Sequence, residues 1–197
     1  MIPVTGIILA GGHSRRMGRN KALLTLGGQT LLERQTEKLR QLEITDILIS
    51  GGNVSLPGTR LIPDQIPERG PLGGLHACLL HAFYPSCLVL CVDAPMVSRQ
   101  ILKALLETAL NSGRDATVLE YNGKLEPLVG VYRAELAERI ACHLRGDDHS
   151  VHSLLHQINA RYVALTGAAE VLSNCNTPEE FRELQASYLR KKQESFI

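Results

Sequence analysis

The first half of the chain alternates short apolar runs with longer stretches that have helical features. The apolar runs are bounded by glycine or polar residues, which is typical of strands buried on both faces of a sheet. They cover residues 5–10, 46–49, 60–62 and 87–92. Three helices are predicted between and after these runs. A broken stripe of leucines indicates the first, a proline in the first turn indicates the second, and a serine N-cap indicates the third. These helices cover residues 30–42, 71–83 and 98–111. The alternation predicts an α/β fold with a parallel, doubly wound sheet.

The second half of the chain has a different pattern. Two apolar stretches flank Asn122 and Gly123, a pair that predicts the turn of a β-hairpin with strands at residues 117–121 and 128–132. Two helices and a last strand are predicted over residues 134–144, 150–158 and 162–165.

The C-terminal region opens with a helix-start signal. Thr177, Pro178 and Glu180 have the spacing of a capping box with proline at the first helical position. They therefore predict a final helix. Because no linker or internal repeat interrupts the chain, we expect one domain over residues 1–197.

Composition and charge exclude several classes of partner. A chain of 197 residues with 44% hydrophobic and 21% charged residues is ordinary for a soluble globular protein. The formal net charge of +1 gives no general electrostatic reason for nucleic-acid binding. No apolar run is long enough to cross a bilayer. We expect a cytoplasmic protein, a monomer, with neither nucleic-acid nor membrane partners.

The cysteines do not indicate a disulfide framework or a zinc site, because their number is odd and no two of them form a C-x-x-C pair. They are Cys78, Cys87, Cys91, Cys142 and Cys175. Buried, reduced thiols are the favoured interpretation.

The segment that directly follows the first strand combines glycine with positive charge. Its glycines and cations are Gly11, Gly12, Arg15, Arg16, Gly18, Arg19 and Lys21. Glycine lets backbone N–H groups approach phosphate oxygens, and ligands of open α/β sheets bind at the carboxyl ends of strands. The spacing matches neither a Walker A loop nor a G-x-G-x-x-G fingerprint. We favour a triphosphate-binding loop over the alternative, a solvated basic loop.

A second glycine-rich turn, residues 70–75, enters a predicted helix after the third strand. Its backbone, together with the helix N-terminus, could bind a base or ribose. The alternative is an ordinary turn between a loop and a helix. Asp64 also ends a strand and could bind ribose hydroxyls or a base, or simply form a turn.

Asp93 follows a fully apolar strand at its carboxyl end. Mg²⁺ prefers one or two carboxylates together with substrate phosphates, so this position predicts a Mg²⁺ ligand. The alternative is an N-cap for the next helix, but that helix is predicted to begin near Ser98, five residues later.

Four motifs in order resemble those of the molybdenum cofactor guanylyltransferases. They are Leu9-Ala10-Gly11-Gly12-x-Ser14-Arg15-Arg16-Met17-Gly18-x-x-Lys21, Gly70-Pro71-Leu72-x-Gly74-Leu75, Cys91-x-Asp93-x-Pro95 and Asn174-x-Asn176-Thr177-Pro178-Glu179-Glu180. The first motif alone indicates only the wider nucleotidyltransferases, whereas the last is much more selective. The resemblance implies a Rossmann-like, three-layer α/β/α fold of the nucleotide-diphospho-sugar transferase type, with a mostly parallel central sheet.

The resemblance also implies an activity: transfer of GMP from GTP to the phosphate of molybdopterin, with release of pyrophosphate. Residues 1–100 or so would then bind the nucleotide, and the remainder would bind the acceptor. Contacts with other proteins of molybdenum cofactor synthesis and with acceptor molybdoenzymes are implied as well.

The family's site residues carry over by position. For the nucleotide these are Leu9, Ala10, Gly11, Lys21 and Asp64. The two glycine-rich segments add Gly12, Gly70, Pro71, Leu72 and Gly74 as candidates for nucleotide binding. Asp93 would bind Mg²⁺, and Asn174 and Asn176 would lie near the active site and the pterin. Lys21, Arg15 and Arg16 would offset the phosphate charge during transfer.

The chain departs from the family pattern at two places. Ser50 ends the second strand where the family often has asparagine, so that nucleotide contact stays open between Ser50 and Asn53. Residues 146–151 are less basic than expected.

Two other functions compete with guanylyl transfer. A cytidylyltransferase acting on the same pterin tends to carry Ala-Ala-Gly where this chain has Ala10-Gly11-Gly12. A nucleotide-binding regulator without turnover would not need Asp93 and Lys21 together.

Overall fold

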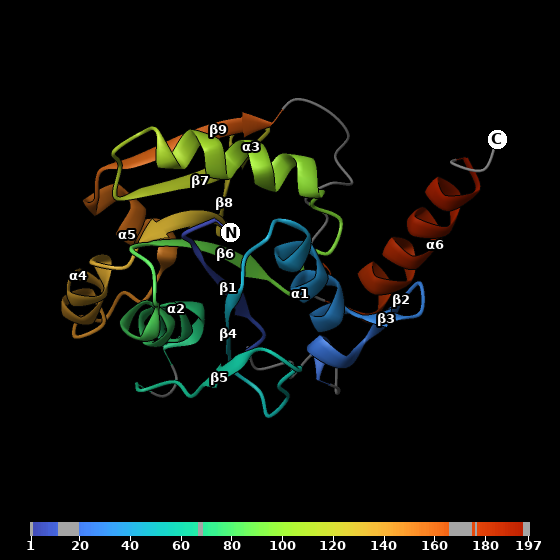
Figure 1. Cartoon of the computed structure of the whole chain (residues 1–197), viewed down its shortest axis with the longest axis horizontal. Coiled ribbons are helices and arrows are strands. Elements are labelled where there is room, and N and C mark those ends of the chain that lie inside the picture. The colour runs from blue at the N-terminus through green and yellow to red at the C-terminus, as the bar shows by residue number, and fades with distance from the viewer. Residues whose placement is uncertain (1, 12–19, 67–68, 166–174, 176, 195–197) are drawn as a thin grey trace.

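A computed structural model describes residues 2–11, 20–66, 69–165, 175 and 177–194. A seven-stranded sheet forms the middle layer, with strand order β5-β4-β1-β6-β8-β7-β9, and helices lie on both sides of it (Figure 1). The sheet strands are β1 Thr5–Leu9, β4 Asp46–Ser50, β5 Arg60–Ile62, β6 Ser86–Cys91, β7 Ala116–Tyr121, β8 Lys124–Arg133 and β9 Ala160–Leu165. The helices are α1 Leu31–Gln41, α2 Gly70–His81, α3 Arg99–Leu110, α4 Leu136–His143, α5 Val151–Gln157 and α6 Pro178–Glu194.

The parallel part of the sheet contains the strands that the apolar runs predicted. β1 pairs in parallel with β4 and β6, and β4 pairs in parallel with β5. Every residue of β1 and β6 is buried, as expected for strands covered on both faces. The prediction of a mostly parallel, three-layer α/β fold is confirmed, because one apolar cluster joins the sheet to α1, α3 and α6 and another joins it to α2, α4 and α5.

The other part of the sheet is mixed. β8 is antiparallel to β6 and β7, and β9 is parallel to β7. Asn122 and Gly123 form the predicted hairpin turn, with φ of 49° and 74°. β8 starts at Lys124 rather than at residue 128, and its pairing with β7 shifts between Val118 and Leu119. Pro127 lies inside this irregularity, where it lacks the N–H that regular pairing would require.

Other predicted boundaries are wrong by a few residues. α2 ends at His81 rather than at residue 83, because Ala82 adopts an extended conformation and its N–H bonds to the Leu79 carbonyl. β9 begins at Ala160, two residues earlier than predicted. Ser98 caps α3 as predicted, with its hydroxyl accepting the Ile101 N–H.

A small hairpin and a 3₁₀ turn were not predicted from the sequence. β2 (Thr25–Leu26) and β3 (Gln29–Thr30) pair with each other, and η1 (Lys21–Leu23) precedes them. The hairpin lies beside α6, which extends away from the sheet (Figure 1). A Cβ on Gly27 would lie 2.4 Å from the Tyr188 ring, so glycine permits this close approach. The Arg34 guanidinium stacks over the same ring at 4.8 Å.

Two further sequence predictions are settled by the fold. The capping box at the start of α6 is present, since Thr177 Oγ1 accepts the Glu180 N–H and Glu180 accepts the Thr177 N–H. All five cysteines are free thiols, and four of them are buried as predicted, but Cys142 is exposed. Of the helices in the described residues, none is long and apolar enough to cross a membrane.

The Gly27–Tyr188 contact gives a stability prediction with a matched control. Gly27 and Gly28 both have positive φ, but a Cβ on Gly28 would meet nothing within 4 Å. We expect Gly27→Ala to lower the free energy of unfolding by about 1 kcal/mol more than Gly28→Ala, because only the first displaces Tyr188. Urea unfolding of the two variants measures the difference. Equal losses would show that the tyrosine contact contributes nothing.

Candidate active site at the carboxyl ends of the parallel strands

The ends of β1, β4 and β6 are tied together by backbone hydrogen bonds. The Ser50 carbonyl accepts the N–H groups of Ala10 and Gly11, at 2.8 and 3.0 Å. On the other side of β1, the Val92 N–H donates to the Leu9 carbonyl at 3.3 Å. The start of the first glycine-rich loop is therefore fixed between the two neighbouring strands.

Glycine is required where the first loop meets the end of β4. A Cβ on Gly51, whose φ is +79°, would lie 2.2 Å from the Gly11 Cα. A Cβ on Gly11 would lie 2.9 Å from the Gly51 Cα. The two backbones thus touch directly. Gly12, Arg15 and Arg16 lie outside the described residues, so their predicted roles stay predictions.

Lys21 and Asp93, which lie far apart in sequence, form an ion pair in the site. Lys21 is the first residue of η1, whose start is capped by the Asn20 side chain accepting the Ala22 N–H at 3.1 Å. Its Nζ lies 3.4 Å from Asp93 Oδ2, and the two side chains are only 14% and 23% exposed. The residues predicted to bind phosphate and metal are therefore adjacent.

The second carboxylate oxygen of Asp93 is available for a ligand. Asp93 Oδ1 is buried and accepts no hydrogen bond of normal geometry from the part of the chain that the structure describes. Leaving a buried acceptor unpaired costs roughly 1–3 kcal/mol. A bound cation would remove this cost, so the geometry fits the predicted metal site. Within the described residues no group of three or more His, Cys, Asp or Glu side chains could hold a metal ion.

The C-terminal motif reaches the same place through Cys175. The Cys175 N–H donates to the Asp93 carbonyl at 3.1 Å. Burial raises the pKa of the Cys175 thiol to about 11, so the thiol stays neutral. Asn174 and Asn176 lie outside the described residues, but they are the covalent neighbours of a residue that contacts Asp93.

Asp64 meets Ser50 and α2 at the end of β5. The Ser50 hydroxyl, on a residue only 2% exposed, donates to Asp64 Oδ1 at 2.9 Å. A Cβ on Gly74 would lie 2.2 Å from Ser50 Oγ, so the glycine of the second motif makes room for this hydroxyl. Asn53 is exposed. Ser50 therefore contacts the candidate site residue Asp64 directly.

The remaining residues of the second motif divide into two groups. Gly70, with a φ of +58°, and Pro71 are exposed at the N-terminus of α2, where backbone N–H groups can face a ligand. Leu72 is completely buried, so its side chain packs in the core instead.

Arg69 was not predicted as a site residue. It precedes α2, and its Nη1 lies 2.8 Å from His149 Nε2. This contact brings a guanidinium to residues 146–151, the segment that is less basic than the family pattern. The only sequence signal for it was its position directly before Gly70.

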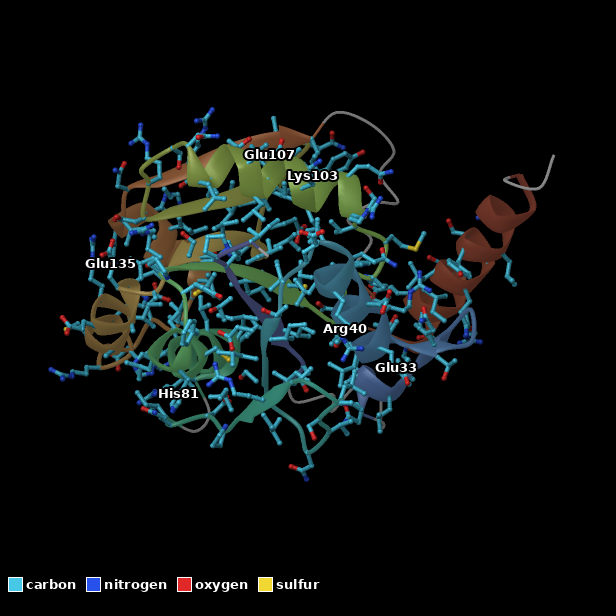
Figure 2. All side chains as sticks on the ribbon, viewed as in Figure 1. Glu33, Arg40, His81, Lys103, Glu107 and Glu135 are labelled. Carbon is cyan, nitrogen blue, oxygen red and sulfur yellow. The ribbon has the colours of Figure 1, made fainter. Side chains whose placement is uncertain are left out.

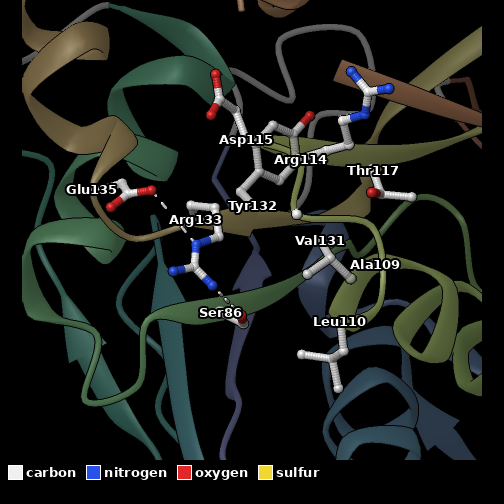
Figure 3. Close-up of a pocket in the computed structure, with 11 residues that line it drawn as sticks. Ser86, Ala109, Leu110, Arg114, Asp115, Thr117, Val131, Tyr132, Arg133 and Glu135 are labelled. Atoms are coloured by element: carbon white, nitrogen blue, oxygen red, sulfur yellow. Dashed lines mark hydrogen bonds and ion pairs between the residues drawn. The ribbon is translucent and has the colours of Figure 1, made fainter. Parts of the chain in front are cut away.

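A pocket near the start of β6, at the end of that strand opposite to Asp93, involves none of the predicted residues. It lies by Ser86 at the start of β6, whereas Asp93 follows the end of that strand (Figure 3). Arg133 donates to Ser86 Oγ at 3.3 Å and pairs with Glu135 at 3.6 Å. Because no sequence-predicted residue lines this pocket, the carboxyl ends of the strands remain the candidate site.

Comparison with known proteins identifies the family. The model of the MobA-like NTP transferase domain matches residues 6–165. The chain belongs to this family. It is 34% identical to a probable molybdenum cofactor guanylyltransferase of Pelotomaculum thermopropionicum over 91% of each chain.

Solved structures of this fold agree with the topology described above. A molybdopterin-guanine dinucleotide biosynthesis protein A from Archaeoglobus fulgidus superposes with a TM-score of 0.80 at 23% identity, covering 94% of this chain and 99% of that one. A Mycobacterium tuberculosis protein in complex with manganese gives 0.74 at 20% identity, covering 93% and 98%. These likenesses show the fold, and the family model confirms the resemblance found in the sequence motifs.

The contact between Gly74 and Ser50 gives a prediction for a double-mutant cycle. Gly74→Ala places a methyl group against Ser50 Oγ, and we expect it to lower the free energy of unfolding by about 1–3 kcal/mol. In the Ser50→Ala background the oxygen is absent, so the same substitution should cost less than half as much. Urea unfolding of the four proteins measures the coupling. Additive effects would disprove the contact.

Proposed function

We propose that this chain transfers GMP from GTP to the phosphate of molybdopterin, producing molybdopterin guanine dinucleotide and pyrophosphate. The observation that carries the proposal is the Lys21–Asp93 pair, joined to Cys175 of the Asn-x-Asn motif. A nucleotide-binding lysine, an acidic metal ligand and the acceptor-binding motif would then meet at one point. The relative at 34% identity is a probable molybdenum cofactor guanylyltransferase, which supports the same reaction.

The reaction requires charge neutralisation more than proton transfer. A phosphate monoester oxygen of the acceptor attacks the α-phosphorus of GTP, the new P–O bond forms, and the bond to pyrophosphate breaks in line. The attacking oxygen is already anionic at neutral pH, so no side chain has to activate it. Lys21 would bind the phosphates and oppose their mutual repulsion. Arg15 and Arg16 are proposed to add positive charge.

We propose Mg²⁺ as the metal, held by Asp93 together with the GTP phosphates. Mg²⁺ in such sites uses one or two carboxylates plus substrate oxygens, and Asp93 would supply such a carboxylate. When bound, the ion would neutralise charge on the triphosphate. The manganese in the Mycobacterium tuberculosis relative supports a divalent cation in this fold.

The other sequence-predicted residues fit this scheme as proposals. Leu9, Ala10 and Gly11, with Gly12, would contact the nucleotide through the loop backbone, and Asp64 with the start of α2 would contact the nucleoside. Asn174 and Asn176 would face the pterin. Residues up to about 100 would bind GTP and later ones the acceptor. We expect a cytoplasmic monomer that meets other proteins of cofactor synthesis transiently.

Replacing Asp93 tests the metal assignment. We expect Asp93→Ala to lower the rate of pyrophosphate release from GTP, Mg²⁺ and molybdopterin by about 10²–10³-fold, because electrostatic stabilisation of the transferring phosphate is lost. The control is Glu107→Ala, which removes an exposed carboxylate on α3 that pairs only weakly with Lys103 (Figure 2). Both variants should keep the wild-type circular dichroism spectrum. A folded Asp93→Ala protein with wild-type turnover would refute the assignment.

Nucleotide preference separates guanylyl from cytidylyl transfer. Ligand at about 100-fold over Kd stabilises the folded state by roughly 2.7 kcal/mol. We therefore expect a clear rise in Tm with GTP and Mg²⁺, and a much smaller one with CTP at the same concentration. Differential scanning fluorimetry gives both values. Equal shifts would contradict the guanine assignment, and binding without turnover would indicate the regulator instead.

A further inference from the structure

Helix α1 carries two long polar side chains that reach from its inner side to another part of the chain. Gln35 is 1% exposed, and Lys38, one turn later, is half-buried. Their helical neighbours Leu31, Leu32 and Leu39 are all buried in the core. An amide or ammonium in such surroundings is unfavourable unless its hydrogen bonds are satisfied. The positions of their partners therefore explain why these residues are tolerated.

Both side chains donate to the turn that contains Asp93. Gln35 Nε2 donates to the Cys91 carbonyl at 2.5 Å and to the Ala94 carbonyl at 3.2 Å. Lys38 Nζ donates to the Pro95 carbonyl at 2.7 Å. Carbonyls before and after Asp93 are thus held by one helix.

The two side chains also orient each other. Lys38 Nζ donates to Gln35 Oε1 at 2.9 Å. Lys38 is the donor in this bond, so the amide oxygen of Gln35 faces Lys38 and its amide nitrogen faces the turn. Burial, and to a lesser extent the nearby Arg34, lower the pKa of Lys38 to about 7. Lys38 therefore makes these hydrogen bonds from a position that is largely shielded from water.

The turn is fixed from three directions while the carboxylate stays available. The Leu9 carbonyl accepts the Val92 N–H, the Cys175 N–H donates to the Asp93 carbonyl, and α1 holds the carbonyls on either side. None of these bonds uses Asp93 Oδ1. Backbone torsions on both sides of Asp93 are therefore set by groups that do not compete for its carboxylate.

We infer that Gln35 and Lys38 are positioning residues that hold the Asp93 turn so that its carboxylate is preorganised for a divalent cation. The inference rests on the proposed function, since it takes Asp93 as the metal ligand. Removing a partner that orients a metal ligand typically weakens metal affinity by about 10- to 100-fold. A purely structural role would lower stability without changing the affinity of folded protein for metal.

Mn²⁺ binding to the whole chain tests this inference without a turnover assay. Free Mn²⁺ is measured by electron paramagnetic resonance during titration in the presence of GTP. We expect Gln35→Leu and Lys38→Met each to raise the Kd for Mn²⁺ by about 10-fold or more. The affinity for GTP in the presence of EDTA should stay at the wild-type value, because neither side chain is placed against the nucleotide.

Thr36→Val provides the matched control. Thr36 is fully buried on the same helix, but its hydroxyl bonds to the Leu32 carbonyl within α1 and does not touch the Asp93 turn. We expect this variant to lose stability in urea yet bind Mn²⁺ as the wild type does. Lys38→Met, on a half-buried position, remains informative if Gln35→Leu fails to fold.

Asp93→Ala separates failure of this inference from failure of the proposed function. If Asp93→Ala leaves Mn²⁺ binding unchanged, the metal assignment itself is wrong. If Asp93→Ala abolishes binding while folded Gln35→Leu and Lys38→Met bind normally, the positioning role is refuted and the metal assignment stands. Weakened binding in Thr36→Val, equal to that in the other two, would also refute it.

Discussion

A partly buried carboxylate with one unpaired oxygen is the constraint around which this site is arranged. Asp93 Oδ2 faces Lys21, while Oδ1 accepts no hydrogen bond of normal geometry from the described residues. Such a group costs free energy in the folded protein until it binds a cation. Around it, the carbonyls of Cys91, Asp93, Ala94 and Pro95 all accept hydrogen bonds. These hydrogen bonds stabilise the backbone of the turn, and the carboxylate remains available to bind a cation.

Close contacts between glycines place the phosphate-binding loop relative to this carboxylate. Gly11 touches Gly51, and the Ser50 carbonyl between the strand ends accepts two N–H groups from the loop. A side chain at either glycine would separate β1 from the end of β4. Gly74 serves the same purpose for α2, since it allows Ser50 to reach Asp64. Gly11 of the first motif and Gly74 of the second are thus explained in part by packing, before any ligand is considered.

The sequence predicted those parts of the fold whose physical signal is local. β1 and β6 are buried on both faces and therefore read as continuous apolar runs. The start of β8 was not predicted, because Pro127 and an irregular pairing interrupt the alternation that marks a strand. β2 and β3 have two residues each, too few to form a pattern.

The same distinction applies to the site. Asp93 and Asp64 could be predicted because each follows a strand, and parallel strands end at one edge of the sheet. Gln35 and Lys38 could not, since polar residues on an amphipathic helix normally face solvent and their partners lie 56 to 59 residues away. The contact between Arg69 and His149, 80 residues apart, is equally invisible in the sequence.

The position of β6 explains how one fold can bring two substrates to a single carboxylate. β6 is parallel to β1, which leads into the proposed nucleotide loop, and antiparallel to β8, which belongs to the proposed acceptor half. Asp93 follows the end of this shared strand. Group transfer requires the attacking oxygen and the phosphorus to be held in line at one point. A residue at the end of the strand common to both halves meets that requirement, whereas one at the end of β4 or β5 would lie on the side of β1 away from the acceptor half. The backbone bond between Cys175 and Asp93 then brings Cys175 of the C-terminal motif to the same point.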